Sequence, residues 1–133
     1  MSSPTFGPSS RRRILVVDDE VALRTLIARA FRDRGYDVME MNDGIGGLDA
    51  VRSASLPFDL VITNSRMPRL SGPQLADCLR QVNPDLPIIH ISGSHSDDKV
   101  RELPSGVPTL FKPFNLWDLV EEAEKLMQER GSH

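Results

Sequence analysis

The sequence predicts an α/β protein in which a doubly wound, five-stranded parallel sheet carries helices on both faces. Short apolar runs alternate with amphipathic stretches five times along the chain. Each apolar run ends abruptly in polar residues, which is typical of a buried parallel strand reaching the edge of its sheet. The 133 residues contain no internal repeat and no linker, so these elements are expected to form one domain.

The composition is that of an ordinary soluble globular protein, with 39% hydrophobic and 26% charged residues. A formal net charge of −3 does not favour nucleic-acid binding, and the basic run at 11–13 is interpreted as a solvated flank of the first strand. Cys78 is the single cysteine, so an internal disulfide is excluded, and no Cys/His cluster resembles a zinc site. No apolar stretch approaches the roughly 20 residues of a membrane span, and we expect a cytoplasmic protein.

We expect one folded domain over residues 12–129, with short flanks on either side. Residues 1–11 are rich in Ser, Pro and Gly, a composition that favours disorder. Residues 130–133 are interpreted as a disordered tail, in which Gly131-Ser132-His133 resembles the remnant of an expression tag.

In the first half of the chain, strands are predicted over 14–17, 36–41 and 58–63. The helix between the first two strands is closed by Gly35. Its apolar stripe consists of Leu23, Leu26, Ile27, Ala30 and Phe31. A second helix over 44–55 is predicted to be weak, because Gly46 and Gly47 each cost about 1 kcal/mol relative to alanine.

In the second half, strands are predicted over 86–91 and 107–111. Helices are predicted over 73–82 and 96–103, ended by Pro84 and Pro104, and a last helix follows the second strand. Asn115 caps this last helix. Its apolar stripe consists of Leu116, Leu119, Val120, Ala123, Leu126 and Met127.

Polar residues stand where each predicted strand ends, namely Asp18-Asp19, Asn42-Asp43, Asn64, Ser92 and Lys112. Because the C-termini of parallel strands lie at one edge, we expect two carboxylates, an amide, a hydroxyl and an ammonium to converge there. Clustered oxygen ligands suit a hard cation such as Mg²⁺, and a lysine beside a hydroxyl suits a phosphoryl group. Taken singly, the acidic pair also fits the start of a helix, and the lysine also fits a surface turn. Their order along the chain favours a shared site.

Four motifs resemble the receiver domains of two-component response regulators: Ile14-Leu15-Val16-Val17-Asp18-Asp19-Glu20, the run from Asp59 to Gly72, Ile89-His90-Ile91-Ser92-Gly93 and Phe111-Lys112-Pro113-Phe114. The resemblance covers nearly the whole chain and implies a flavodoxin-like receiver fold. It is closest to single-domain receivers and to receivers attached to hybrid histidine kinases.

The resemblance implies a metal site at the ends of the first and third strands. Asp18 and Asp19 match the acidic pair that binds Mg²⁺ in the family. The backbone carbonyl of Arg66 matches another metal ligand. Asn64 retains a side-chain oxygen at the position of a further ligand, but it lacks the negative charge of an aspartate, so weaker Mg²⁺ binding is expected.

The resemblance also implies a phosphoryl site. Ser92 matches the hydroxyl that contacts the phosphoryl group, and Lys112 matches the lysine that bonds a phosphoryl oxygen. The peptide bond before Pro113 is commonly cis in this family. Asn64, however, stands where the family carries its phosphoacceptor aspartate, and a neutral amide is a far weaker nucleophile than a carboxylate. Thr109 stands where many receivers carry an aromatic switch residue.

We therefore interpret the chain as a phosphorelay receiver domain, not an enzyme, that normally takes a phosphoryl group from a histidine kinase onto a strand-end aspartate. With Asn64 it is expected not to be phosphorylated as given. One alternative is a natural pseudo-receiver that binds proteins independently of phosphorylation. A more distant alternative is a small phosphatase resembling the haloacid dehalogenase group, although Asp18-Asp19-Glu20 lacks that group's spacing of two aspartates.

The partners implied are a histidine kinase or phosphotransfer protein and a downstream effector protein, with no DNA-binding domain and no membrane. The resemblance also implies a homodimer through the last strand and the last two helices. Trp117 lies off the apolar stripe, beside Glu121 and Glu124. It is predicted either to contact a partner or to cover the edge of the fold.

Overall fold

The computed structural model describes residues 11–93 and 98–131, and within them five parallel strands form one sheet in the order β2-β1-β3-β4-β5. The strands are β1 (Arg13–Val17), β2 (Asp37–Met41), β3 (Leu60–Asn64), β4 (Ile88–Ser92) and β5 (Thr109–Phe111). The helices are α1 (Val21–Arg32), α2 (Gly44–Ser53), α3 (Gly72–Val82), α4 (Leu116–Gly131) and the short 3₁₀ helix η2 (Asp98–Glu102). The predicted fold class is confirmed.

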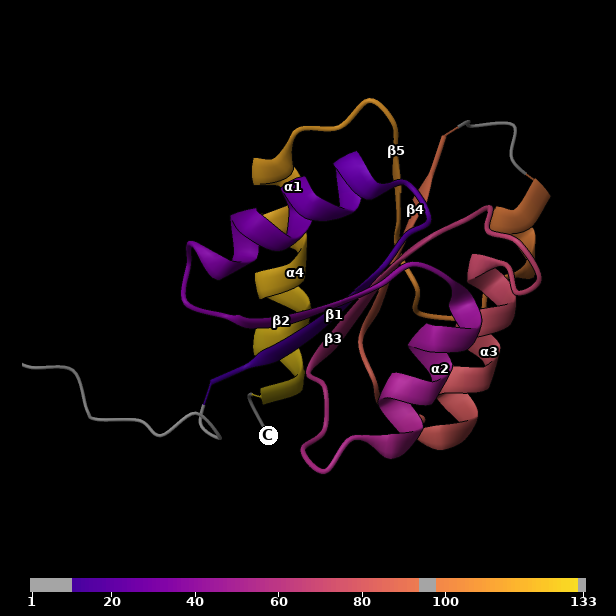
Figure 1. The fold of residues 1–133 in the computed structure, drawn as a ribbon, viewed down its shortest axis with the longest axis horizontal. Helices are drawn as coiled ribbons and strands as arrows, with labels where there is room; N and C mark the ends of the chain where they lie inside the picture. Colours follow the sequence, from indigo (N-terminus) through magenta and orange to yellow (C-terminus); the bar gives the residue numbers. More distant parts are fainter. Residues whose placement is uncertain (1–10, 94–97, 132–133) are drawn as a thin grey trace, which may run out of the picture.

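Helices cover both faces of the sheet, with α1 and α4 on one face and α2 and α3 on the other (Figure 1). Successive residues of a strand point to opposite faces, so β1 serves both cores. Ile14 and Val16 pack in the core with α1 and α4, whereas Leu15 and Val17 pack in the core with α3. Full burial of each such aliphatic side chain contributes roughly 1.5–3 kcal/mol.

One residue of the predicted α1 stripe lies outside the core. Leu26 is 53% exposed, whereas Ile27, Ala28 and Phe31 are fully buried. The buried positions follow the 3.6-residue repeat along a line that Leu26 only borders, because it lies about 100° around the helix from Ile27. Periodicity therefore identified the apolar side of α1, but the buried face is centred on Ile27, Ala28 and Phe31 and leaves Leu26 at its border.

Two residues of the weak helix α2 region are explained by their contacts, Asp43 by a local one and Gly47 by a tertiary one. Asp43 caps it, with Oδ1 accepting a hydrogen bond from the backbone N–H of Gly46 at 2.6 Å. This carboxylate, which follows β2, therefore supports a helix start. A Cβ at Gly47 would lie 2.8 Å from Cγ2 of Val17, so glycine lets α2 approach β1 closely. The helix ends at Ser53, two residues before the predicted end.

Two elements in the second half, the short helix before β5 and β5 itself, are shorter than predicted. The predicted helix over 96–103 is the 3₁₀ helix η2, and positions 96 and 97 lie outside the described residues. The predicted strand over 107–111 begins only at Thr109. The predicted cap of α4 is confirmed, because Oδ1 of Asn115 accepts from the N–H of Asp118 at 2.7 Å.

The predicted flanks are only partly covered. Positions 1–10 and 132–133 lie outside the described residues. Helix α4 continues to Gly131, beyond the predicted domain end at residue 129. Across the described chain, no helix combines the length and the apolar character needed to span a membrane.

Candidate functional site

The C-terminal edge of the sheet gathers the predicted site residues, and we call it the polar edge: Asp18, Asp19, Asn64, Ser92 and Lys112. On β1 and β3, Val17 is paired with Thr63, so Asp18 and Asn64 are the next residues on two adjacent strands. The register between these two central strands therefore places a carboxylate beside an amide at the middle of the sheet.

The register of the remaining strands extends the polar edge. Asn64 is paired with Ile91, so Ser92 follows directly on β4. Ser92 in turn is paired with Phe111, and its carbonyl accepts a hydrogen bond from the N–H of Lys112 at 2.8 Å. Each polar residue is thus one step further along its strand than a residue paired with the neighbouring strand.

Asp18 is held by burial and by its own backbone turn. It is only 1% exposed, and its Oδ1 accepts from the N–H of Glu20 at 2.9 Å. Its Oδ2 is buried and has no hydrogen-bond partner among the described residues. Burial raises the pKa of the Asp18 carboxyl, and the hydrogen bond from Glu20 and the charge of Lys112 oppose that rise. Asp19, by contrast, is exposed.

Asn64 is fixed by the loop that follows it. Its Nδ2 donates a hydrogen bond to the backbone carbonyl of Arg66 at 3.1 Å. Its own carbonyl accepts from Oγ1 of Thr63 at 3.0 Å. A Cβ at Gly72 would lie 2.2 Å from that carbonyl oxygen, so only glycine allows α3 to start against the end of β3.

Helix α3 also carries a sequence-coded start. Oγ of Ser71 accepts from the N–H of Gln74 at 3.3 Å, and Oε1 of Gln74 accepts from the N–H of Ser71 at 2.9 Å. This reciprocal capping box satisfies donors that the first turn would otherwise leave unpaired. Hydrogen bonds therefore hold both ends of the loop between β3 and α3, from Asn64 at one end and from Ser71 at the other.

Lys112 reaches across the sheet to Glu20, a residue to which the family resemblance assigns no role. Its Nζ lies 3.5 Å from Oε1 of Glu20, which follows β1, and the two side chains are 30% and 57% exposed. The Lys112–Pro113 peptide bond is cis, as the resemblance implies. The signal for Glu20 was present in the sequence, since the acidic run after the first strand continues for a third residue.

Ser92 lies next to a second polar pair that joins β4 to β5. Ser92 and His90 are both fully buried. Nδ1 of His90 lies 3.3 Å from Oγ1 of Thr109, within hydrogen-bonding distance. Thr109, at the position where many receivers carry an aromatic side chain, is thus engaged with a buried neighbour on the next strand.

The residues of the polar edge fit a divalent cation in part. Asp18 and Asp19 supply carboxylate oxygens, and the buried Oδ2 of Asp18 is an acceptor that a cation would satisfy. The carbonyl of Arg66, however, already accepts from the Asn64 amide. Within the described residues no group of three His, Cys, Asp or Glu side chains is arranged to hold a metal ion.

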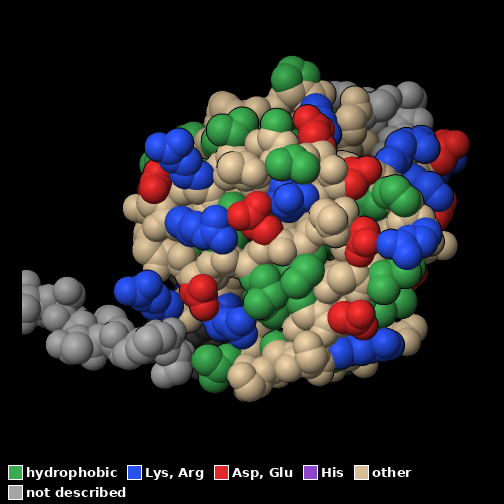
Figure 2. All heavy atoms as spheres, viewed as in Figure 1, with side chains coloured by type: hydrophobic (Ala, Val, Ile, Leu, Met, Phe, Trp, Pro, Cys, Tyr) green, Lys and Arg blue, Asp and Glu red, His purple; other side chains and the backbone are tan. Residues whose placement is uncertain are grey.

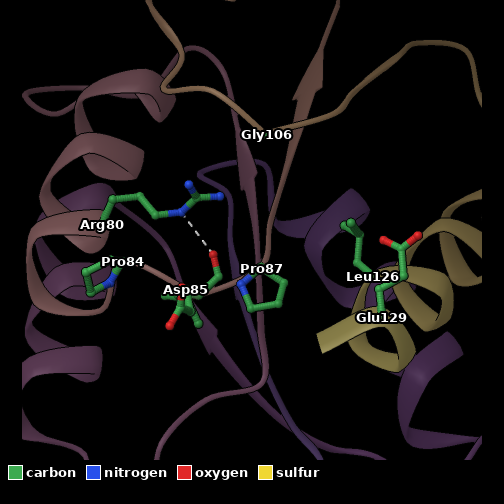
Figure 3. Close-up of a pocket in the computed structure, with 8 residues that line it drawn as sticks. Arg80, Pro84, Asp85, Pro87, Gly106, Leu126 and Glu129 are labelled. Carbon is green, nitrogen blue, oxygen red and sulfur yellow. Dashed lines mark hydrogen bonds between the residues drawn. The ribbon is translucent and has the colours of Figure 1, made fainter. Parts of the chain in front are cut away.

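Two hollows differ in their relation to the polar edge. One of about 600 Å³ lies where β4 and β5 begin, at the opposite end of the sheet, between Arg80 on α3 and Leu126 on α4 (Figure 3). A smaller one of about 340 Å³ adjoins the polar edge and is lined by Glu20, Leu23, Leu26, Lys112, Pro113, Phe114 and Leu116. The second hollow, which we call the α1 groove, is mostly apolar.

The surface charges give no sign of a nucleic-acid interface on the face drawn in Figure 2. Basic and acidic side chains are interspersed there, without a continuous basic patch (Figure 2). Several of them form ion pairs, such as Arg24 with Glu40 at 3.2 Å and Arg34 with Glu124 at 3.1 Å. This agrees with the mild net charge of −3.

A family model described as the response regulator receiver domain matches residues 14–124. The response regulator receiver protein CpdR of Brucella abortus is 31% identical over 118 residues, which are 87% of this chain and 97% of CpdR. The sensor kinase CckA of the same organism is 32% identical over 124 residues, which are 92% of this chain but 13% of CckA. A solved response regulator receiver protein from Sinorhizobium medicae matches with a TM-score of 0.84 and 26% identity, covering 91% of this chain and 98% of that one.

Proposed function

The chain belongs to the response regulator receiver domains of two-component signalling, and we propose that it is a phosphorelay receiver in which Asn64 occupies the phosphoacceptor position. Receiver domains are generally signalling modules without enzymatic activity of their own. The observation that carries the proposal is the register that places Asn64 on β3 between Asp18 on β1 and Ser92 on β4. The chain is proposed to work in the cytoplasm.

The polar edge divides the tasks of phosphoryl recognition among its residues. The ammonium of Lys112 would bond a phosphoryl oxygen, and the hydroxyl of Ser92 would donate to another. The amide oxygen of Asn64 is uncharged and is a much weaker nucleophile than a carboxylate oxygen, so its attack on phosphorus is strongly disfavoured. With asparagine at position 64, the chain is therefore proposed to keep the recognition groups of a receiver without accepting the phosphoryl group.

Receiver domains typically bind Mg²⁺ at the phosphorylation site, where the ion neutralises charge on the phosphoryl oxygens. In this chain Asp18, Asp19, Asn64 and the carbonyl of Arg66 would hold it. Binding is proposed to be weak, because Asn64 contributes no charge and its amide donates to that carbonyl. The buried carboxylate of Asp18 remains the strongest single attraction for a cation at this edge.

A natural pseudo-receiver is the second candidate, and the contacts of Asn64 and Thr109 favour it. Asn64 is hydrogen-bonded within its own loop, and Thr109 lies within hydrogen-bonding distance of the buried His90. A module with these contacts would present one surface to its partners whether or not a phosphodonor is present. The two candidates share a fold and differ in whether restoring an aspartate restores phosphorylation.

Receiver domains interact with histidine kinases or phosphotransfer proteins, and we propose the α1 groove as the contact surface for such a partner. Leu26, 53% exposed, lines this groove together with Lys112 of the polar edge. A partner seated there would bring its phosphohistidine to the end of β3. An effector protein is proposed as a further partner, and a homodimer is proposed through β5, η2 and α4.

The proposed function is tested by intact mass after incubation with Mg²⁺ and acetyl phosphate, for the native chain and for Asn64→Asp in parallel. We expect only the Asn64→Asp protein to gain one phosphoryl group. If neither protein gains it, the receiver function of this edge is wrong and the pseudo-receiver is the better account. A Leu26→Asp change in the Asn64→Asp protein is expected to leave acetyl phosphate labelling intact and to reduce transfer from a histidine kinase.

A further inference from the structure

We propose that the side-chain amide of Asn64 acts as an internal replacement for the divalent cation, so that the loop from β3 to α3 is completed without metal. This inference rests on the proposed assignment of the polar edge. It concerns what holds the loop in place, whereas the proposed function concerns what the edge recognises.

The contact that carries the inference is the hydrogen bond from Nδ2 of Asn64 to the carbonyl of Arg66, 3.1 Å long. A carboxylate at position 64 has only acceptor oxygens and could not make it. Two acceptor oxygens at this separation repel each other unless a cation or another donor lies between them. The amide supplies its own donor, and therefore satisfies the carbonyl that a metal would otherwise ligate.

The backbone between the two partners of this hydrogen bond is fixed. The N–H of Ser65 donates to the carbonyl of Ile91 at 2.8 Å, which ties the residue after Asn64 to β4. The carbonyl of Ser65 accepts from the N–H of Gly72 at 2.8 Å, which ties it to α3. Asn64 and Arg66 thus flank a residue whose backbone is fixed on both sides.

The lysine of the polar edge shows the same self-sufficiency. Nζ of Lys112 lies 3.5 Å from Oε1 of Glu20, so the ammonium has a carboxylate partner although position 64 is neutral. Both side chains are substantially exposed, and such a pair contributes little stability. It nevertheless gives the ammonium a carboxylate partner that does not depend on the charge at position 64.

The test compares thermal unfolding of the native chain, Asn64→Asp and Asn64→Ala, each in EDTA and in excess Mg²⁺ at matched ionic strength. For the native chain we expect a change of less than about 1 °C on adding Mg²⁺. Asn64→Asp is expected to unfold at a lower temperature than the native chain in EDTA and to recover by several degrees in Mg²⁺, roughly 4 °C or more. Asn64→Ala lacks the donor and the charge, so it is expected to be destabilised in both buffers.

Gln128→Glu, which adds one negative charge at an exposed position of α4, serves as the charge control and is expected to show no Mg²⁺ response. The inference is overturned if Mg²⁺ stabilises the native chain as much as it stabilises Asn64→Asp, or if Asn64→Ala is as stable as the native chain. A second measurement needs no variant. At Mg²⁺ concentrations that saturate Asn64→Asp, the side-chain amide resonances of Asn64 in the native chain should shift little, and a saturating shift in that range would contradict the inference.

The two proposals fail separately. If the native chain responds to Mg²⁺ while Asn64→Asp is phosphorylated by acetyl phosphate, the replacement of the cation is wrong and the receiver function stands. If Asn64→Asp alone responds to Mg²⁺ but is never phosphorylated, the replacement stands and the receiver function is wrong.

Discussion

Asp18 and Lys112 carry the opposite charges of the polar edge, yet the fold holds them in very different ways. Asp18 is 1% exposed and follows a strand with four buried residues in succession. Lys112 has a 30% exposed side chain and follows the three-residue strand β5, in which every residue is only half-buried. Residues of β1 and α1 pack in one core, and β1 lies inside the sheet, whereas β5 is one of its two edge strands (Figure 1).

The carboxylate of Asp18 is therefore fixed in place, whereas the ammonium of Lys112 can move. A buried carboxylate cannot move to meet a ligand, because its position is set by the packing around β1. A half-exposed lysine on a short edge strand can exchange partners at low cost, since its pairing with Glu20 is weak. If the charge at position 64 changes, we therefore expect Lys112, next to β5, to change its position or partner, while Asp18 stays in place.

The largest effect is expected where the edge is most tightly packed. Gly72→Ala would place a Cβ about 2.2 Å from the carbonyl oxygen of Asn64, and we expect it to destabilise the fold by about 3 kcal/mol. Gly93→Ala is the matched control after β4, where an added Cβ meets no described atom within 4 Å. Urea unfolding of both variants measures the difference, and equal effects would contradict the contrast between the two junctions.

A smaller effect is expected from removing the fixed charge. Asp18→Asn in metal-free buffer at neutral pH is expected to stabilise the fold by about 1 kcal/mol, because a neutral amide is buried at lower cost than a carboxylate. Asp19→Asn is the matched control, because that carboxylate is exposed, and it is expected to change stability by less than about 0.5 kcal/mol. Chemical denaturation compares the free energies of unfolding of the two variants. If Asp18→Asn destabilised the fold, the interactions of the buried carboxylate would outweigh the cost of burying its charge, and the prediction would be wrong.

A contact in the middle of α4 shows whether the helix after Lys112 is itself loosely held. The hydroxyl of Tyr36 donates to Oε2 of Glu124 at 2.9 Å, and burial together with this carboxylate raises the pKa of Tyr36 to about 12. Since the folded pKa is raised, the stability that this pair contributes is complete below about pH 10 and is lost as the pH rises through about 12.

Tyr36 is the only tyrosine of the chain, so absorbance at alkaline pH follows its ionisation alone. We expect Glu124→Gln to lower the midpoint toward the ordinary value near 10. Glu121→Gln on the same helix is the control and should leave the midpoint unchanged. A midpoint near 10 in the native chain would mean that α4 is not anchored at this point.

The smallest effect on stability is expected from removing the ion-pair partner of Lys112. Glu20→Gln removes the partner of Lys112, and we expect the free energy of unfolding to change by less than about 0.5 kcal/mol, since the pair is half-exposed and screened by salt. Thermal unfolding at low and high salt checks this. A loss well above that value would show that Lys112 is held as firmly as Asp18, and the comparison would then fail.

The order of the elements was predictable from the sequence because each rests on local chemistry. The apolar runs beginning at Ile14 and Leu86, the Asn115 cap and the proline after Asn83 are all signals within a few residues. The polar residues at the strand ends were predictable for the same reason, since parallel strands bring their C-termini to one edge. The roles assigned to those residues stay predictions until the measurements above are made.

The sequence by itself determined which side of each element is apolar and which polar groups reach the edge of the sheet. Only the tertiary structure decided that Leu26 is left in the α1 groove and that Lys112 lies beside Glu20. The physical reason is the sequence separation of the residues that interact. Periodicity and caps depend on neighbours a few residues apart, whereas burial at a helix rim and the choice of a hydrogen-bond partner depend on segments that meet only when the sheet is assembled.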